Sequence, residues 1–308
     1  TAAMKAIVEA KTGHIAFYSH DGKPLLSESK SGGKTIVPFK VPSREIGADS
    51  HLSEEQLHGV SWHALFDSPK DEAFYGLGQH QAEELNMKGK NEDLYQYNTK
   101  VSIPFVISNK NYGILWDSYS FCRFGNPEDY MQLNRAFTLY NKEGKRGSLT
   151  GTYIEKDGKR LVRNEDSIYY EFALPELARK KAGTDIGVAN LPASFKLNGA
   201  HVTYEGYLEA PVENVYCFML YYAGYMKVYL DGKEVVPERW RTAWNPNSYK
   251  FTFPMKKGHK AKLLIDWFPD GDVSYCGLRV ASPRSEDEQN KLSIWSEMTP
   301  DMDYYVIT

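Results

Sequence analysis

Cysteine is scarce in this chain of 308 residues, and long apolar runs are missing. The three cysteines, Cys122, Cys217 and Cys276, are too few and too widely spaced for a disulfide framework or a CxxC-type metal site. No stretch approaches the roughly 20 apolar residues needed to cross a bilayer, so we expect no membrane span. The first residues lack a charged segment followed by an apolar one, and we therefore expect no signal peptide in this sequence.

Blocks of one charge are missing as well. The 37 basic and 40 acidic residues are dispersed along the chain and give a net charge of −3. A nucleic-acid-binding surface needs a concentrated basic patch, so we expect no nucleic-acid partner. The eight histidines form no HxxxH or HExxH pattern, and both a GxSxG nucleophile elbow and a phosphate-binding glycine loop are absent. We therefore expect no metal, no cofactor and no catalytic residue in this chain.

Aromatic residues are abundant instead. They make up 14% of the sequence and include 22 tyrosines and 6 tryptophans. Such side chains pack well on half-buried strands, which favours a β-rich protein. Tyrosine and tryptophan also present a flat apolar face with a polar edge, which suits a sugar ring. For an individual tyrosine, both roles remain open: packing in a core and contact with a sugar.

Short strand-like runs dominate the chain. Each is bounded by Gly, Pro, Asn or Asp, and examples are residues 7–10, 14–18, 61–66, 102–108 and 113–117. Apolar periodicity of 3.6 residues is almost absent, and the best helical candidate, residues 175–181, is short. The pattern predicts an all-β chain built from β-sandwiches.

Chain length and two polar stretches indicate two domains. The chain exceeds the size at which one hydrophobic core usually stops growing. Residues 142–147 are polar and punctuated by glycine, and residues 285–291 are charged, as is typical of boundaries. Because the ends of a domain often lie close together, one domain can be inserted into another. We predict a discontinuous domain of residues 1–147 and 289–308, interrupted by an inserted domain of residues 148–288.

Four motifs occur in order in the first predicted domain. They are FYGLGQHQ at residues 74–81, Asn98-Thr99, IPF at residues 103–105 and YGILWD at residues 112–117. Together they resemble the N-terminal domain of glycoside hydrolase family 31, in particular of its α-xylosidases. The resemblance implies a galactose-mutarotase-like β-sandwich beside a catalytic (β/α)8 barrel that is absent from this chain. It also implies that a loop of the sandwich forms part of the active-site wall.

Two features of this region fit that role. Gly76 and Gly78 permit a sharp turn and a close backbone approach that a Cβ atom would block. Gln96, Asn98 and Thr99 place uncharged donors and acceptors on a candidate rim loop, where they can bind sugar hydroxyls. In the wider family the position that matches Asn98 is often an aspartate that recognises the sugar at the cleaved end, so Asn98 departs from the family pattern.

The inserted segment has a resemblance of its own. The motifs that carry it are LTGTY at residues 149–153, YEGYLEAP at 204–211, VYLDGK at 228–233 and LRV at 278–280. They resemble the protective-antigen-type (PA-14) domain, a β-sandwich inserted in many glycosidases and adhesins, where it commonly binds glycans. Adhesin members bind calcium through two consecutive aspartates in a central loop. Here that loop, residues 221–225, offers almost no carboxylate, so we expect no calcium.

Aromatic side chains of the insert are the candidates for sugar stacking. They are Tyr222, Tyr225, Trp240 and Trp244. An exposed aromatic face can cover the apolar side of a pyranose ring. Core packing is the alternative role for Trp240. In some α-xylosidases such an insert overhangs the active site, and the resemblance implies the same role here.

One acidic pair near the end of the chain resembles the nucleophile signature of family 31. Retaining glycosidases use two carboxyl groups about 5 Å apart. Asp301 and Asp303 lie after the second boundary, however, in a segment that matches the approach to the barrel. We interpret this pair as non-catalytic.

The sequence thus predicts the non-catalytic N-terminal part of an α-xylosidase-like family 31 enzyme. It would shape the active-site entrance and help to bind xylose-containing oligosaccharides of the xyloglucan type, and its partners would be the oligosaccharide and the catalytic barrel of the same polypeptide. A free-standing carbohydrate-binding protein and a structural scaffold that binds no sugar are the alternatives. A homo-oligomer is open, and so is the compartment, although the periplasm or bacterial cell surface is favoured over the cytoplasm.

Overall fold

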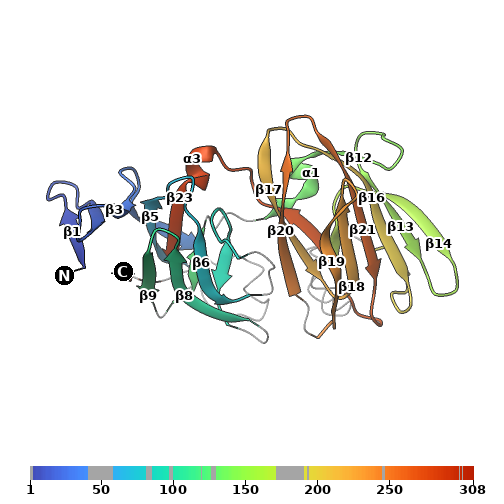
Figure 1. Cartoon of the computed structure of the whole chain (residues 1–308). Coiled ribbons are helices and arrows are strands. Elements are labelled where there is room, and N and C mark those ends of the chain that lie inside the picture. Colours follow the sequence, from blue (N-terminus) through green and yellow to red (C-terminus); the bar gives the residue numbers. More distant parts are fainter. Residues whose placement is uncertain are drawn as a thin grey trace. The chain divides into compact units, whose positions relative to one another are not determined.

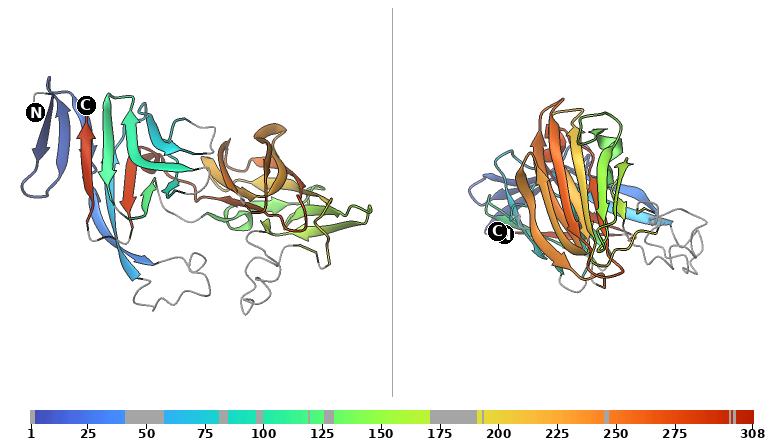
Figure 2. Two further views of the ribbon diagram at one scale, coloured as in Figure 1. Left: turned by 90° about the horizontal axis from the view of Figure 1, so that it is seen from below. Right: turned by 90° about the vertical axis from the view of Figure 1, so that its right-hand side faces the viewer.

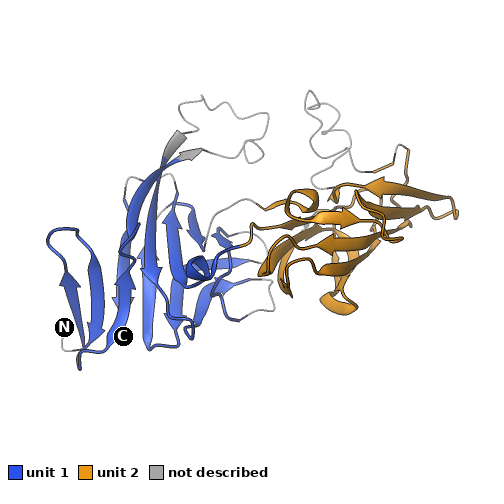
Figure 3. Ribbon diagram, turned by 90° about the horizontal axis from the view of Figure 1, so that it is seen from above, with its two compact units in different colours: residues 1–127, 284–308 blue, residues 128–283 orange. Residues whose placement is uncertain are grey.

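The computed structural model describes the greater part of the chain. The described residues are 3–40, 58–80, 85–96, 100–118, 120–125, 130–170, 191–192, 194–244, 247–297, 299 and 301–308. The chain divides into two compact units (Figures 1 and 3). Unit 1 comprises Thr1–Pro127 and Arg284–Thr308, and unit 2 comprises Glu128–Pro283. The predicted helix at residues 175–181 lies outside the described residues.

Unit 1 contains two antiparallel sheets. The larger has the order β1-β2-β3-β5-β23-β10-β7, and β4 also pairs with β5. Its strands are β1 (Met4–Val8), β2 (Ile15–Ser19), β3 (Pro24–Glu28), β4 (Lys34–Lys40), β5 (His58–Asp67), β7 (Glu92–Leu94), β10 (Cys122–Phe124) and β23 (Lys291–Ser296). The hairpin of β1 and β2 forms one edge of this sheet (Figure 2). The smaller sheet has the order β24-β9-β8-β6 and consists of β6 (Phe74–Gln79), β8 (Val101–Ser108), β9 (Tyr112–Asp117) and β24 (Asp303–Ile307).

The core of unit 1 lies between these sheets, because alternate residues of their strands point inward. In β9, Tyr112, Ile114 and Trp116 are buried, and they share one cluster with Phe66 of β5 and Ile294 of β23. Strands β23 and β24 follow unit 2 in the sequence, so the sandwich of unit 1 is completed by the chain that returns after the insertion.

The YGLG motif forms a bulge in β6. The register with β8 shifts between Gly76 and Gly78, and the intervening Leu77 has a φ of 66°. A Cβ atom on Gly76 would lie 2.5 Å from the carbonyl oxygen of Phe105, and one on Gly78 would lie 2.2 Å from that of Val101. The predicted need for glycine at both positions is confirmed.

Unit 2 also contains two antiparallel sheets. One has the order β14-β13-β16-β21-β18-β19, with β12 also paired to β16. Its strands are β12 (Thr138–Tyr140), β13 (Leu149–Ile154), β14 (Arg160–Glu165), β16 (His201–Glu209), β18 (Gly224–Leu230), β19 (Lys233–Arg241) and β21 (Lys260–Phe268). The other has the order β11-β22-β17-β20, with β15 also paired to β22. It consists of β11 (Met131–Gln132), β15 (Tyr169–Tyr170), β17 (Asn214–Tyr222), β20 (Asn247–Met255) and β22 (Cys276–Val280).

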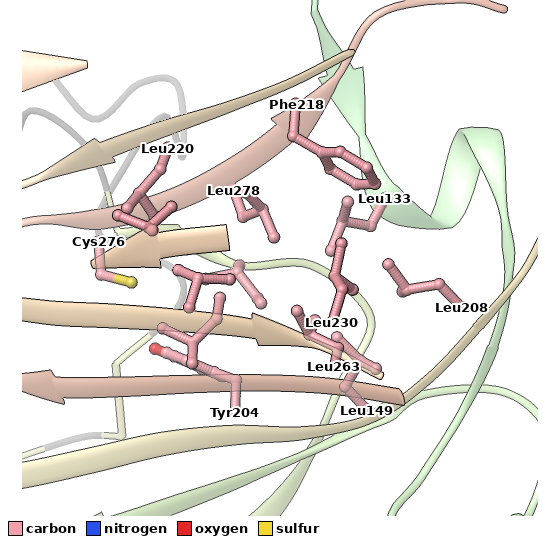
Figure 4. Packing of buried hydrophobic residues seen from close by; sticks show 14 of the residues in the cluster. Leu133, Leu149, Tyr204, Leu208, Phe218, Leu220, Leu230, Leu263, Cys276 and Leu278 are labelled. Carbon is pink, nitrogen blue, oxygen red and sulfur yellow. The ribbon is translucent and has the colours of Figure 1, made fainter. Parts of the chain in front are cut away.

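The two sheets of unit 2 enclose a large apolar core. Burial alternates strictly along β16, whose odd-numbered residues are half-buried and whose even-numbered residues are buried. Tyr204 of β16, Phe218 of β17 and Leu263 of β21 all belong to this core (Figure 4). The described residues are thus almost entirely strand and loop, with short helices at α1 (Leu133–Ala136) and α3 (Glu286–Gln289), and the predicted all-β fold class is confirmed.

The boundaries between the units differ from the predicted ones. Unit 2 begins at Glu128 and not at residue 148, because β12 pairs with β16 and Leu139 is buried in the core of unit 2. The polar stretch 142–147 is a turn within unit 2, closed by the Asn141 N–H donating to the Lys145 carbonyl at 2.9 Å. The charged stretch near residue 286 forms α3 in unit 1, where Ser285 and Glu288 make a capping box.

Candidate functional site

The predicted site residues fall in three different environments. In unit 1, Gln96 is exposed two residues after the end of β7, and Asn98 and Thr99 lie outside the described residues. In unit 2, Tyr222 is 2% exposed and belongs to the core, so its ring has no face open to a ligand. The other three aromatic residues predicted as site residues in unit 2 are exposed: Tyr225 by 48%, Trp240 by 45% and Trp244 by 92%.

Tyr225 and Trp240 form an exposed aromatic pair. They lie opposite each other in the register of β18 and β19, with ring centroids 6.3 Å apart and ring planes inclined by 41°. The Trp240 indole N–H donates to Oδ2 of Asp270 at 2.8 Å. Trp240 is therefore not packed in the core, and its polar edge fixes the position of an acidic side chain.

Asp270 lines a cavity of about 420 Å³ at one end of unit 2. Its wall consists of Thr242, Ala243, Trp244, Asp270, Gly271, Asp272, Val273 and Tyr275. Trp244 and Tyr275 supply aromatic surface, and the two aspartates supply hydrogen-bond acceptors. The volume lies within the range of ordinary small-molecule sites.

Buried hydrogen bonds to Ala223 hold the segment that follows β21, residues 269–275, in place. The carbonyl oxygen of Ala223, between β17 and β18, accepts from Trp267 Nε1 at 2.8 Å and from Ser274 Oγ at 2.7 Å. The backbone N–H of Ala223 donates to the carbonyl oxygen of Tyr275 at 2.9 Å. Gly224, with a φ of 87°, permits this approach, since a Cβ atom there would lie 2.5 Å from the Phe268 carbonyl oxygen. Both ends of the acidic turn are thus held in place.

This arrangement suits a neutral polyhydroxylated ring. Large aromatic side chains normally bury most of their surface, so a tryptophan as exposed as Trp244 offers a free apolar face. Carboxylates beside it can accept hydrogen bonds from hydroxyl groups. Burial raises the pKa of Tyr275, so its phenol stays protonated and can donate a hydrogen bond.

The sequence predicted one residue of the cavity wall, Trp244, and missed Thr242, Asp270, Asp272 and Tyr275. A signal was present in the run Pro269-Asp-Gly-Asp272, a turn sequence directly after the alternating apolar and polar residues of β21. Turn residues of this kind are common on surfaces, and their position beside Trp244 becomes visible in the folded chain.

Unit 1 holds a buried ionic cluster next to Gln96. Lys100 Nζ lies 2.7 Å from Glu92 Oε1 and donates to the carbonyl oxygen of Asp93 at 2.5 Å. His80 Nδ1 lies 3.3 Å from the same oxygen of Glu92. Glu92 and Lys100 stand on either side of Gln96 in the sequence, so the cluster fixes both ends of the predicted rim loop.

Three further observations concern metal sites, membrane-spanning helices and the acidic pair near the end of the chain. Among the described residues, no group of three or more His, Cys, Asp or Glu side chains is arranged to hold a metal ion. Within the described ranges, no helix has the length and apolar character of a membrane span. Asp301 and Asp303 are exposed in unit 1, where Asp303 is the first residue of β24 and Asp301 precedes it by two residues.

The fold and the site together define a protein of two β-sandwiches, one of which carries a cavity of aromatic and acidic side chains. Residues 1–124 match the N-terminal galactose mutarotase-like domain of glycosyl hydrolase 31. This part of unit 1 is thus similar to the N-terminal domain of glycoside hydrolase family 31, and the resemblance inferred from the four motifs is confirmed.

One solved structure and two related sequences also resemble this chain. The structure of the family 31 α-xylosidase of Xanthomonas citri matches 100% of this chain with a TM-score of 0.81 and 33% identity, over 31% of its own length. An α-xylosidase of Saccharolobus solfataricus is 32% identical over 32% of this chain and 14% of its own. An uncharacterised family 31 glucosidase of Pseudescherichia vulneris is 31% identical over 37% of this chain and 23% of its own. The chain thus spans less than a third of each of these relatives.

Proposed function

We propose that this chain is the non-catalytic front part of an α-xylosidase-like family 31 glycoside hydrolase, and that unit 2 binds xylose-containing oligosaccharides of the xyloglucan type. The match of the whole chain to the Xanthomonas citri α-xylosidase supports the first half of the proposal. The cavity beside Trp244, whose side chain is 92% exposed, carries the second half.

In the proposed complex, the face of Trp244 stacks on a pyranose ring. Asp270 and Asp272 accept hydrogen bonds from sugar hydroxyls, and Trp240 holds Asp270 in place through its indole N–H. Tyr225 extends the aromatic surface next to Trp240. We assign unit 2 to the PA-14 type as part of this proposal, on its sequence motifs and its two-sheet architecture.

Unit 1 has a different role in the proposal. Its rim loop, with Gln96, Asn98 and Thr99, shapes the entrance of the active site on a catalytic barrel of the same polypeptide. The buried pair of Glu92 and Lys100 supports this role by fixing the ends of the loop. Because the loop depends on a barrel to complete the site, unit 1 alone should bind sugar weakly.

Calorimetric titration of the chain with xyloglucan heptasaccharide tests sugar binding. Maltoheptaose is the ligand control, and a calcium chelator should change nothing. Trp244→Ala should weaken binding at least about tenfold, or roughly 1.4 kcal/mol, because it removes the stacking surface. Asp270→Asn keeps an acceptor for Trp240 but removes the charge, and a smaller loss is expected. Tyr305→Ala is the matched control, because it also removes an exposed aromatic side chain but does so in unit 1.

The outcomes separate the possible roles. Selective binding that Trp244→Ala abolishes supports the cavity as the site. No binding of either oligosaccharide would instead support a structural scaffold that binds no sugar itself. In a parallel assay the chain should release no 4-nitrophenol from its α-xyloside. Release that falls when Asp301 or Asp303 is replaced by asparagine would refute the non-catalytic assignment.

A further inference from the structure

One sheet of unit 2 carries an aromatic residue at the same level of four neighbouring strands. The strands are β16, β21, β18 and β19, which lie side by side (Figure 1). Tyr225 of β18 pairs with Phe268 of β21 on one side and with Trp240 of β19 on the other. His201 of β16 stacks on Phe268, with ring centroids 4.1 Å apart and ring planes inclined by 2°. We call these four residues the aromatic row.

The aromatic row lies on the outer face of the sheet. Burial alternates along β18 and β21, so that the core-facing residues are buried and Tyr225 and Phe268 stand on the opposite side. Phe268 is 44% exposed, close to the values for Tyr225 and Trp240, and the His201 side chain is 35% exposed. Contacts between aromatic residues of adjacent strands stabilise a sheet, but here they leave nearly half of three rings in solvent. Exposed apolar surface that is gathered in this way marks an interaction site.

A polar row runs beside the aromatic row. Its members are Thr203, Asp266, Lys227 and Glu238, one from each of the same four strands. Asp266 Oδ1 lies 2.5 Å from His201 Nε2, and Lys227 Nζ lies 3.1 Å from Glu238 Oε2. Because acidic and basic groups face each other, the polar row has no block of one charge that would select an ionic ligand. It offers hydrogen-bond donors and acceptors to hydroxyl groups at fixed positions.

The aromatic row ends beside the cavity of unit 2. The Trp240 indole N–H donates to Asp270, which lines the cavity together with Trp244. Phe268 is the last residue of β21 and precedes Asp270 by two residues. The row and the cavity wall are therefore continuous, and a ligand with one ring in the cavity can continue along the row.

The length of the aromatic row fits a chain of several sugar rings. Neighbouring strands lie about 4.8 Å apart, so the distance across the sheet from β16 to β19 is roughly 14 Å. One pyranose ring cannot contact all four aromatic side chains, whereas linked rings can contact them in succession. Each aromatic side chain offers an apolar surface to a ring, and the polar row can bind the hydroxyl groups at its rim.

We propose that the aromatic row binds the main chain of a neutral polysaccharide, as a second surface in addition to the cavity beside Trp244. This inference rests on the proposed function, from which it takes xyloglucan as the ligand. The cavity binds a short stretch of sugar, and the aromatic row binds further rings of the main chain. Phe268 and His201, which are not part of the cavity wall, then determine the preference for long chains.

Binding to ligands of two lengths tests the aromatic row. The 308-residue chain is run through native gels that contain soluble xyloglucan polymer, and its retardation gives the affinity for long chains. Calorimetric titration with xyloglucan heptasaccharide gives the affinity for short ones. Phe268→Ala should weaken polymer binding about fivefold, because it removes a ring of the row, and should change heptasaccharide affinity less than about twofold. Phe268→Leu keeps apolar bulk without the ring and should show a similar loss.

Controls and further variants decide between the outcomes. Tyr305→Ala in unit 1 and Val162→Ala on β14 of the same sheet remove exposed side chains away from the row, and neither should change polymer binding. Unchanged polymer binding in both Phe268 variants would overturn the proposal, even where Trp244→Ala abolishes heptasaccharide binding, since the cavity then acts alone. No retardation of the original chain would overturn it as well.

Two more results separate the aromatic row from the cavity and from the stability of the sheet. Equal losses for both ligands in the Phe268 variants contradict a separate surface for long chains, and a lowered melting temperature would then make Phe268 a structural contact of the sheet. Polymer binding that survives Trp244→Ala but falls in the Phe268 variants would support the row and refute the cavity. Either proposal can therefore fail alone.

Discussion

Both units are built from two antiparallel sheets, but their interiors differ. Unit 2 encloses a large core of apolar and aromatic side chains, and its candidate site residues stand on loops at one end. Unit 1 has a smaller core and buries several charged side chains. Its buried charged residues include Glu28, Glu72, Glu92, Lys100 and Glu297.

The difference bears on what each unit does. A closed apolar core gives a rigid support, on which a few loop side chains can form a site without help from elsewhere. Buried ionic groups add less stability than apolar packing, but losing one partner of such a group is costly, so they fix local geometry. This difference agrees with the proposed function, in which unit 2 binds sugar by itself and unit 1 is completed by a catalytic domain.

Truncation of Trp267 should have the largest effect on stability. The side chain is fully buried in unit 2 and donates to the Ala223 carbonyl oxygen that also anchors Ser274. Trp267→Ala should lower the free energy of unfolding of unit 2 by about 3–5 kcal/mol, measured by chemical denaturation. Leu161→Ala, at an exposed position of β14, is the control and should change little. A loss below about 1 kcal/mol would show that the core of unit 2 is less closed than its burial indicates.

The second largest effect on stability is expected in unit 1, when the buried ion pair of Lys100 and Glu92 is broken. Lys100→Met removes the ammonium group 2.7 Å from the Glu92 carboxylate, and both side chains are less than a tenth exposed. Breaking such a pair typically costs about 3 kcal/mol or more, and the double variant with Glu92→Gln should recover part of the loss. Lys23→Met, which breaks the exposed pair with Asp21, is the control and should have no measurable effect. Equal effects of the two lysine variants would contradict a structural role for the buried pair.

The stability of unit 1 should also depend on pH through His63. The imidazole stacks on Trp295 with ring centroids 3.8 Å apart, and Nε2 lies 2.8 Å from Ser293 Oγ. Burial lowers the pKa of His63 to about 4, from 6.5 in an unfolded chain. Between these values the unfolded chain binds a proton that the folded chain does not, so stability is lost as pH falls.

The variant His63→Gln isolates this contribution. It keeps a hydrogen-bonding group but cannot take up the proton, so unfolding curves between pH 7 and pH 4 should show a smaller loss than in the original chain. The difference can reach the order of 3 kcal/mol at pH 4. Measurement at pH 7 separates the loss of packing from the loss of titration. Parallel pH profiles for the two proteins would contradict a buried neutral imidazole.

Much of the architecture was predictable from local patterns. Alternating burial in strands, the glycine requirement at Gly76 and Gly78, and the return of the chain to unit 1 all follow from short motifs and their order. The boundary near residue 145 was not, because a polar turn such as residues 142–147 has the same composition as a linker. Long-range pairing of β12 with β16 decides between them.

The candidate site was predictable in part. Trp240 and Trp244 stand in a polar segment, and their exposure agrees with that setting. Tyr222 shares its strand face with Phe218 and Leu220, so its place in the core follows from alternation along β17. The cavity itself joins two segments that are distant in sequence, and no local pattern brings Asp270 next to Trp244.

The smallest effect on stability is expected at Trp244, the counterpart of Trp267 in the same unit. Its side chain is 92% exposed, so Trp244→Ala removes little buried surface and should change the free energy of unfolding by less than about 0.5 kcal/mol. The same variant should lose most of its affinity for xyloglucan heptasaccharide in the proposed function. Denaturation and titration of one preparation measure both. A destabilised Trp244→Ala variant would make this side chain a structural contact, and the proposed separation in unit 2 between a supporting core and a binding surface would then fail.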